Sequence, residues 1–408
     1  MPATPSLPQK NKNSRRQLTF TAALLSMVGP LSINAYLPSF PDIEATFGAT
    51  RAVLAQSLTV YLLAFAVSTL FWGPLSDRVG RRRTLLASMS LYLIASIACA
   101  LSPDAKSLLL WRAAQGLTAS GGFIIARAMI RDSYDTRSAH KAMTHVTLLF
   151  ALGPAIAPVL GGWLQQLFGW RSIFWFLGGF GLLLVFLGLA IKETLPRNKR
   201  QSLHPYKVSI AYLQIISHSR FVCLVFSVSF AFAGMFLYIA GAPTVIYNFL
   251  GLSTNDFGLQ FIPMVAGMML GSYYSGRKAH GWQAARTIGI GFCIMIIASA
   301  LNLLSSLFNT ATLFSVIAPL VIYAFGYAMI MPAITIVALD YFPQRRGGAT
   351  SMQGFVQIAV SATVTSIAIP LLHSSRFSFA IGQLFFLSIA AALILFFYHL
   401  ENNVAADT

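Results

Sequence analysis

The sequence predicts an all-α membrane protein of twelve transmembrane helices, arranged as two pseudo-symmetric bundles of six. Three observations lead to this prediction. Of the 408 residues, 56% are hydrophobic and only 10% are charged, whereas a soluble domain carries about 25% charged residues. The mean hydropathy is +0.70, and the apolar residues gather in stretches long enough to cross a bilayer. The 28 Lys and Arg residues fall mostly between those stretches.

Twelve stretches approach the length of a membrane-spanning helix, which needs about 20 predominantly apolar residues. They cover residues 18–41, 52–73, 84–102, 107–130, 139–164, 171–191, 220–248, 257–276, 285–307, 312–336, 348–372 and 378–399. A cleaved signal peptide is the alternative for the first stretch and its basic lead. That stretch is longer than the apolar core of a signal peptide, so we expect it to be the first span.

The distribution of basic residues predicts the orientation. With the N-terminus in the cytoplasm, Arg51, Lys106, Arg171 and Arg376 are periplasmic, Arg112 and Arg127 lie within the fourth span, and all other Lys and Arg residues are cytoplasmic. This asymmetry follows the positive-inside rule. We expect a multi-pass protein of the bacterial inner membrane with both termini in the cytoplasm. Its parts would be a tail (1–17), a first bundle (18–191), a cytoplasmic linker (192–219), a second bundle (220–399) and a second tail (400–408).

Composition also limits the function. The net charge is +17, and the basic residues lie in short groups between apolar stretches. A nucleic-acid-binding protein instead clusters Lys and Arg on one face with aromatic or polar side chains that contact bases, so we expect no nucleic-acid partner. Cys99, Cys223 and Cys293 each lie alone in an apolar run, which indicates small buried side chains rather than metal ligands or disulfides. We expect no cofactor and no metal. An enzyme would need a clustered His, Glu or Cys site, and a sensor a soluble output domain; the sequence indicates neither.

The loop after the second span carries the most specific signal. It reads Gly73-Pro74-Leu75-Ser76-Asp77-Arg78-Val79-Gly80-Arg81-Arg82-Arg83, and a weaker echo occurs at residues 271–278. The glycines permit a tight turn, and the aspartate can cap a helix or pair with an arginine. A simple positive-inside anchor is the alternative, but it explains the arginines and not the glycine–aspartate spacing.

This loop resembles motif A of the major facilitator superfamily, G-x-L-(S/A)-D-R-x-G-R-(R/K). The resemblance implies two bundles related by an axis along the membrane normal. It also implies that the loop is a cytoplasmic latch between the two halves. The residues that would form the latch are Gly73, Asp77, Arg78, Gly80, Arg81 and Arg82.

The fourth span contains Leu108, Arg112, Gln115 and Gly116. An arginine inside a bilayer costs several kcal/mol unless it is paired or hydrated, so we interpret Arg112 as functional. The alternative is a side chain that reaches the membrane surface from near the helix end. The pattern resembles motif B of the same superfamily, which implies a role for Arg112, Gln115 and Gly116 in proton coupling.

The fifth span carries a stripe of small residues and prolines, Gly153, Pro154, Pro158, Gly161 and Gly162. Such residues let helices approach closely and bend. The alternative is an ordinary packing seam. The string G-P-x-x-x-P-x-x-G-G resembles motif C, which is the antiporter signature of drug exporters in this superfamily.

Shorter strings resemble the Bcr/CflA group of drug:proton antiporters. They include residues 31–38, 127–132, 169–175 and 192–196, and the resemblance is fainter in the second half. That group usually has an aspartate where this chain has Asn34, and an amide carries no proton at physiological pH. The proton would then need a carboxylate near the membrane surface or His145, which we interpret first as a packed or interfacial residue. A facilitated exporter without strict proton coupling remains an alternative.

Polar and aromatic residues near mid-membrane predict a cavity for a drug-sized substrate. The predicted cavity residues are Asn34, Tyr36, Tyr61, Arg127, Tyr238, Gln260, Tyr327 and Gln357, with Tyr247, Tyr323 and Gln353 nearby. The alternative for the tyrosines is a belt at the lipid interface. Because the spans lack central carboxylates, we expect neutral, zwitterionic or weakly anionic cargo rather than quaternary cations.

These features predict a monomeric efflux transporter that exports drug-like or amphipathic small molecules by alternating access, in exchange for protons. Its partners would be the substrate, protons and the lipid bilayer. The alternative is an exporter or facilitator of one metabolite, such as a siderophore or a sugar derivative.

Overall fold

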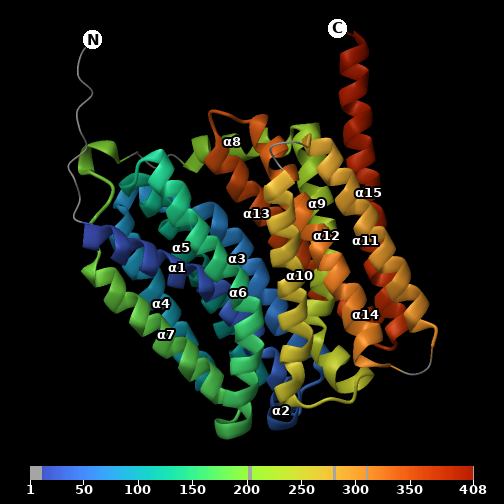
Figure 1. Cartoon of the computed structure of the whole chain (residues 1–408). Helices are drawn as coiled ribbons and strands as arrows, with labels where there is room; N and C mark the ends of the chain where they lie inside the picture. The colour runs from blue at the N-terminus through green and yellow to red at the C-terminus, as the bar shows by residue number, and fades with distance from the viewer. Residues whose placement is uncertain (1–11, 201–204, 279–281, 309–310, 408) are drawn as a thin grey trace.

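A computed structural model describes residues 12–200, 205–278, 282–308 and 311–407, and within these ranges the chain contains helices and no strand (Figure 1). Parts of the predicted tails and linker, namely residues 1–11, 201–204 and 408, lie outside the described residues. The all-helical prediction is therefore confirmed for the described chain.

The helices follow one another along the chain in two halves joined by a linker. The first half contains α1 (Lys12–Asn34), η1 (Leu37–Ser39), α2 (Phe40–Phe47), α3 (Arg51–Val79), α4 (Arg81–Ala100), α5 (Ala105–Ser133), α6 (Thr136–Phe168) and α7 (Arg171–Ala190). The linker carries η2 (Arg197–Lys199) and α8 (Pro205–Ile216). The second half contains α9 (Ser219–Ala240), η3 (Thr244–Phe249), η4 (Thr254–Asp256), α10 (Phe257–Lys278), α11 (Ala284–Ser306), α12 (Leu313–Asp340), α13 (Arg346–Thr363), η5 (Val364–Ala368), α14 (Ile369–Leu372) and α15 (Arg376–Asp407).

Ten of the described helical segments are long and apolar enough to cross a membrane. The remaining two of the twelve predicted spans are α5 and α10, which do not reach the same mean hydropathy. Helix α5 carries Arg112 and Arg127, and both helices are rich in Gly and Ser. We assign them as spans because they pack among the apolar helices, and their polar side chains Arg112, Gln115 and Gln260 are buried within the protein.

The packing relates the two halves by an approximate two-fold axis. In the first half α3 packs on α5, α4 on α5 and α7, and α1 on α6. In the second half the matching pairs are α10 with α12, α11 with α12 and α15, and α9 with α13. The halves meet through α3 against α13 and α6 against α10, and the same two-fold relates these two contacts. This arrangement agrees with the predicted pair of six-helix bundles, while their boundaries in residue numbers stay predictions.

Three predicted spans are interrupted rather than continuous. The span at 18–41 breaks after Asn34, the span at 220–248 breaks after Ala240, and the span at 348–372 changes to a π-helix at Val364. Proline explains the first two breaks, since Pro38 and Pro243 lack an N–H and fix the backbone. The linker is also more ordered than a polar connection suggests, because α8 occupies much of it.

Side-chain contacts define two ends of the molecule. At the terminal end, the start of α1 meets the end of α5 through Thr19 and Tyr134, whose hydroxyls lie 2.6 Å apart. Helix α8 and the C-terminal part of α15 lie at this end, and α2 lies at the opposite, distal end (Figure 1). Aspartates cap the helices that start at each end. The pKa of Asp104 is lowered by the Ser107 backbone N–H and that of Asp135 by the Ser138 side chain.

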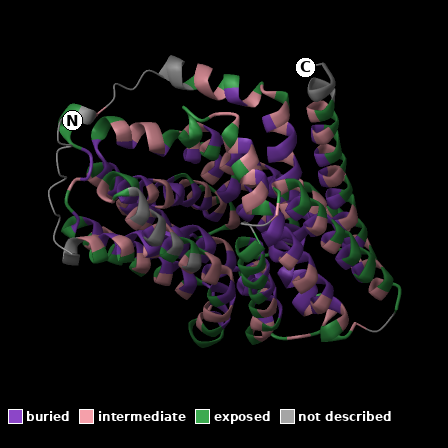
Figure 2. Cartoon of the chain, turned by 45° about the horizontal axis from the view of Figure 1, so that its top comes forward, coloured by how far each residue is buried: buried purple, intermediate pink, exposed green. Residues whose placement is uncertain are grey.

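Burial follows the pattern expected of a protein in lipid. Buried residues concentrate between the helices, and exposed residues lie on their outward faces (Figure 2). Those outward faces carry large apolar side chains such as Phe20, Leu110, Trp163 and Phe186. The prediction that all three cysteines are buried is wrong for Cys293, which is exposed on α11, whereas Cys99 and Cys223 are buried. A lone apolar position in a span does not reveal whether it faces protein or lipid.

Candidate transport site

The turn between α3 and α4 requires glycine at position 80. Its φ of 109° is one that other residues rarely adopt. A Cβ there would also lie 2.6 Å from Glu193 Oε2 and 2.7 Å from Arg200 Nη2. Gly73 is under no such constraint, because a Cβ at that position would make only an ordinary contact with Ile124.

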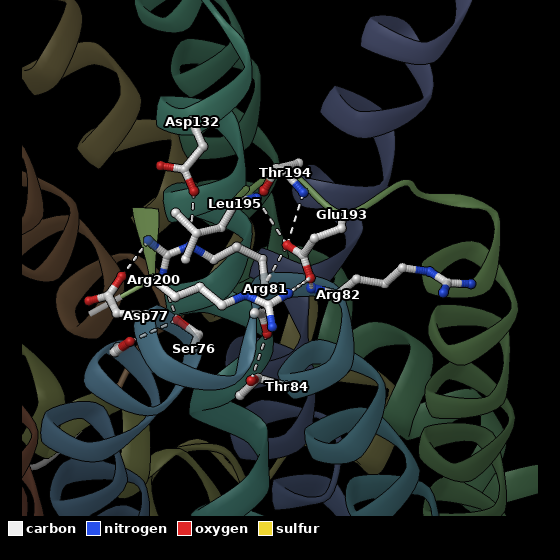
Figure 3. Close-up of polar contacts among 12 residues, drawn as sticks. Ser76, Asp77, Arg81, Arg82, Thr84, Asp132, Glu193, Thr194, Leu195 and Arg200 are labelled. Carbon is white, nitrogen blue, oxygen red and sulfur yellow. Dashed lines mark hydrogen bonds and ion pairs between the residues drawn. The ribbon is translucent and has the colours of Figure 1, made fainter. Parts of the chain in front are cut away.

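Arg81 is the centre of the polar cluster at this turn (Figure 3). The residue is 3% exposed. Its guanidinium pairs with Asp77 at 2.5 Å and with Asp132 at 2.9 Å, and it donates a hydrogen bond to Ser76 Oγ at 2.5 Å. Arg81 thus joins the end of α3, the start of α4 and the end of α5.

Glu193 completes the cluster from the start of the linker. Its carboxylate accepts hydrogen bonds from the backbone N–H groups of Arg81, at 3.0 Å, and Arg82, at 3.2 Å. These groups belong to the first turn of α4, where a helix favours negative charge. The predicted site residues omitted Glu193 and Asp132. Both lie in the short strings of the Bcr/CflA resemblance, but nothing in those strings indicates that they meet Arg81.

The remaining motif A residues lie at the edge of this cluster. Arg82 donates to the carbonyl of Leu189 at 2.7 Å, and Arg78 is exposed. The side-chain partners of Asp77 and Arg81 described above belong to the first half, and Glu193 belongs to the linker. A latch between the two halves therefore stays a prediction.

Arg112 lies inside the first half and has no exposed surface. Its Nη1 donates to the Ser32 carbonyl at 3.1 Å and to Gln115 Oε1 at 2.5 Å. The guanidinium also lies 4.5 Å from the ring centre of Tyr36 and 4.3 Å from that of Tyr61. Gly116 permits this arrangement, because a Cβ there would collide with the Tyr61 carbonyl.

The predicted antiporter stripe of α6 contacts α1 and the second half. A Cβ at Gly153 would lie 2.6 Å from Pro30 Cβ, and one at Gly161 would collide with the Ala35 carbonyl. A Cβ at Gly162 would lie 2.5 Å from the carbonyl of Thr254 in the second half. Pro154 and Pro158 lie within α6, which continues through both. At Gly161 and Gly162 another backbone thus comes too close for a side chain, and at Gly153 the ring of Pro30 does.

The predicted cavity residues fall into separate groups. Tyr36 and Tyr61 surround Arg112. Tyr238 and Gln260 belong to a buried cluster in the second half, where Asn302 Nδ2 donates to Tyr238 Oη at 2.6 Å and to Gln383 Oε1 at 2.8 Å. The sequence prediction missed both Asn302 and Gln383, whose amides are not distinctive within their spans.

Four predicted residues lie apart from these clusters. Gln357 donates to Tyr327 Oη at 3.0 Å. Arg127 is partly exposed, its guanidinium lies 4.0 Å from the ring centre of Phe123, and no ion pair joins it to a described carboxylate. Asn34 is buried and donates to the Pro30 carbonyl at 2.8 Å. Within the described chain no group of three or more His, Cys, Asp or Glu side chains could hold a metal.

The two halves close against each other at the distal end. The Tyr247 hydroxyl donates to the Pro38 carbonyl at 2.6 Å, and Asn255 Nδ2 donates to Gln166 Oε1 at 2.5 Å. Deeper in the molecule the hydroxyls of Thr59 and Thr365 lie 2.7 Å apart. We call this set of contacts the distal gate.

The two-bundle architecture is that of a known protein family. The model of the Major Facilitator Superfamily matches residues 22–363. The chain belongs to the Major Facilitator Superfamily. Members of this superfamily are transporters, so the chain is a membrane transporter rather than an enzyme.

Curated relatives are similar over nearly the whole chain. An uncharacterized MFS-type transporter, YdgK of Bacillus subtilis (strain 168), is 30% identical over 359 residues, or 86% of this chain and 88% of the relative. Multidrug resistance protein MdtL of Escherichia coli O45:K1 (strain S88 / ExPEC) is 28% identical, with 94% of this chain and 95% of the relative covered. Multidrug resistance protein D of Escherichia coli (strain K12) is 25% identical, with 88% and 89% covered.

Solved structures share the fold at lower identity. A bacterial homologue of the human lysosomal transporter Spinster, described as inward-facing and unoccupied, gives a TM-score of 0.72 at 16% identity and covers 95% of this chain and 97% of its own. The xylose transporter XylE from E. coli, described as partially occluded and inward open, gives a TM-score of 0.72 at 15% identity, with 95% and 98% covered.

Proposed function

We propose that this transporter exports drug-like or amphipathic small molecules across the bacterial inner membrane, as a drug:proton antiporter of the Bcr/CflA type. The observation that carries the proposal is the glycine stripe of α6. Its antiporter-like string coincides with the contact between α6, α1 and the second half, which is where an alternating-access transporter must open and close. The similarity to two proteins named for multidrug resistance supports the same assignment.

In this proposal the terminal end faces the cytoplasm, because the basic residues gather there. The closed distal gate then faces the periplasm. The motif A cluster would act as the cytoplasmic latch, with Asp77 and Arg81 exchanging partners between the two states. Arg112, Gln115 and Gly116 would take part in proton coupling.

We propose that the cargo is neutral, zwitterionic or weakly anionic. Arg127 supports this, since an arginine at membrane depth without a described carboxylate partner is available to an acidic or polar group of a substrate. Arg127→Gln should reduce the export of a weakly acidic compound several-fold. The export of a neutral compound should stay within about twofold of that of the parent protein. Gly179→Ala is the matched control, because a Cβ there would contact nothing within 4 Å.

The test of the main proposal is drug accumulation in a host that lacks its own efflux pumps. Cells that express the chain should accumulate less of at least one amphipathic drug, and dissipation of the proton gradient should abolish the difference. Proteoliposomes with and without a pH gradient then measure the coupling directly. No difference across a broad drug panel would contradict drug export.

The alternative is export or facilitated passage of one metabolite without strict proton coupling. The observation in its favour is that Asn34 occupies the position of the usual aspartate, while the ion-paired carboxylates described here lie at the terminal end. Export that is unaffected by the pH gradient, for a single compound only, would favour this alternative.

A further inference from the structure

The break in the first span exposes backbone carbonyls inside the protein. Helix α1 ends at Asn34, and η1 begins at Leu37. The last four carbonyls of a helix have no intrahelical donor and need other partners when they are buried. Pro38 has no N–H to offer them, so the break leaves acceptors at a point where Ser32, Asn34 and Ala35 are all buried.

Arg112 supplies a donor to this break. Its Nη1 lies 3.1 Å from the Ser32 carbonyl. Gln115 fixes the same nitrogen from one turn along α5, and Gln115 Nε2 in turn donates to Ser96 Oγ at 2.8 Å. The guanidinium therefore has a defined position relative to α4, α5 and the end of α1.

The end of α1 also stabilises the positive charge of Arg112. The described chain offers it no carboxylate, and its Nε and Nη2 have no acceptor in hydrogen-bonding geometry. The C-terminus of a helix carries a partial negative charge that favours a nearby cation. The faces of Tyr36 and Tyr61 add further attraction for the guanidinium.

The other side of the break contacts α6 and the distal gate. Gly161 packs so closely on the Ala35 carbonyl that no side chain would fit between them. Three residues further on, the Pro38 carbonyl accepts the hydrogen bond of Tyr247 from the second half. One short segment, residues 32–38, therefore contacts Arg112, the α6 stripe and the gate.

We infer that Arg112 is a positioning residue that fixes the break of α1 and thereby stabilises the closed distal gate. The guanidinium holds the end of α1, the end of α1 sets the place of Pro38, and Pro38 receives Tyr247. Loss of Arg112 shifts the equilibrium of the two halves toward a state that is open at the distal end. The inference concerns a conformational equilibrium and holds whichever substrate is carried.

The test measures closure of the gate in the purified full-length protein. Gln166→Cys and Asn255→Cys are introduced in a background in which Cys99, Cys223 and Cys293 are replaced by Ala. Gln166 and Asn255 are exposed and hydrogen-bonded across the halves, so a short bifunctional thiol reagent should link the two cysteines efficiently. Arg112→Met should lower the linked fraction about threefold. Arg171→Gln should not, since this arginine at the same end donates to the Ser102 carbonyl and stacks on Trp170.

Tyr247→Phe tests whether Arg112 and the gate act together. It should lower the linked fraction by itself, and its combination with Arg112→Met should lower it by less than the product of the two single effects. Gln115→Met removes the acceptor that orients the guanidinium, together with the donor to Ser96 Oγ. It gives a milder shift in the same direction and serves if Arg112→Met does not fold. An unchanged linked fraction in a monodisperse Arg112→Met or Gln115→Met protein overturns the inference, as does an equal loss in Arg171→Gln. Because the readout needs no substrate, failure of the drug-export proposal would leave it intact.

Discussion

Arg81 contributes to stability through two ion pairs in a mostly buried position. Its side chain is 4% exposed and meets Asp77 and Asp132, which are 39% and 19% exposed. Removal of one partner of a largely buried pair leaves charges without compensation, so the loss is larger than for a surface pair. The two partly hydrated carboxylates reduce that loss.

We therefore expect Arg81→Ala to destabilise the protein by on the order of 2 kcal/mol. The measurement is the loss of monodisperse protein on heating in detergent, followed by size-exclusion chromatography. Arg83→Ala is the control, since Arg83 is exposed two residues further along the same run. Equal thermal stability of the two variants would show that the Arg81 cluster is dispensable for folding.

Asn34 tests the coupling of transport to protons. The amide is 3% exposed and donates to the Pro30 carbonyl. A protonated aspartic acid could keep that donor, whereas an ionised one would place a charge among buried groups without a partner. Asn34→Asp should consequently make export more dependent on pH, with at least a twofold change between pH 6 and pH 8 beyond that of the parent. Superimposable pH profiles would exclude this position from proton coupling.

Individual residues were predictable where the chemistry is local and not where it depends on distant partners. The glycine at 80 follows from the turn, and Arg112 is conspicuous because a bilayer disfavours charge. Tyr36 and Tyr61 instead pack on Arg112 rather than forming one cavity wall with Tyr327 and Gln357. The positions of these tyrosines depend on which faces of three different helices pack against one another. No local pattern in a single sequence indicates that packing.

The glycine stripe of helix α6 packs on α1 within the first half and on η4 of the second half. Because a Cβ at Gly162 would lie 2.5 Å from the Thr254 carbonyl, a larger side chain would hold α6 and η4 apart. Gly162→Val should keep the distal gate from closing, reduce export at least tenfold and leave the amount of protein in the membrane nearly unchanged. Reaction of a membrane-impermeant thiol reagent with Asn255→Cys reports the opening. Efficient export by the variant would show that this close approach is not needed for the cycle.

The existence of the helices was predictable, but their interruptions were not. Apolar length gives the number of spans, since the bilayer sets it. The prolines at 38 and 243 were visible in the sequence, yet proline is tolerated in membrane helices when neighbours satisfy the freed groups. Pro38 interrupts α1, and the break is tolerated inside the protein because Arg112 donates to the Ser32 carbonyl. That contact is tertiary.

The charge asymmetry of the whole chain predicts its orientation in the membrane. If the terminal end faces the cytoplasm, a fluorescent protein fused to the C-terminus should fluoresce and a periplasmic phosphatase fused there should be inactive. The same reporters fused after residue 103 should give the opposite result. Phosphatase activity from the C-terminal fusion would invert the assignment of every loop and make the distal gate cytoplasmic.

Helix α8 connects both halves at the terminal end. The Tyr212 hydroxyl donates to the Leu70 carbonyl of α3 at 3.3 Å, and burial raises the pKa of this phenol, which keeps it a neutral donor. Two residues away, Gln214 accepts a hydrogen bond from Arg345 at the start of α13. A rocking motion that changes the separation of α3 and α13 at this end must stretch or break one of these bonds. The connecting segment is thus a restraint on how far the two halves can move apart at this end.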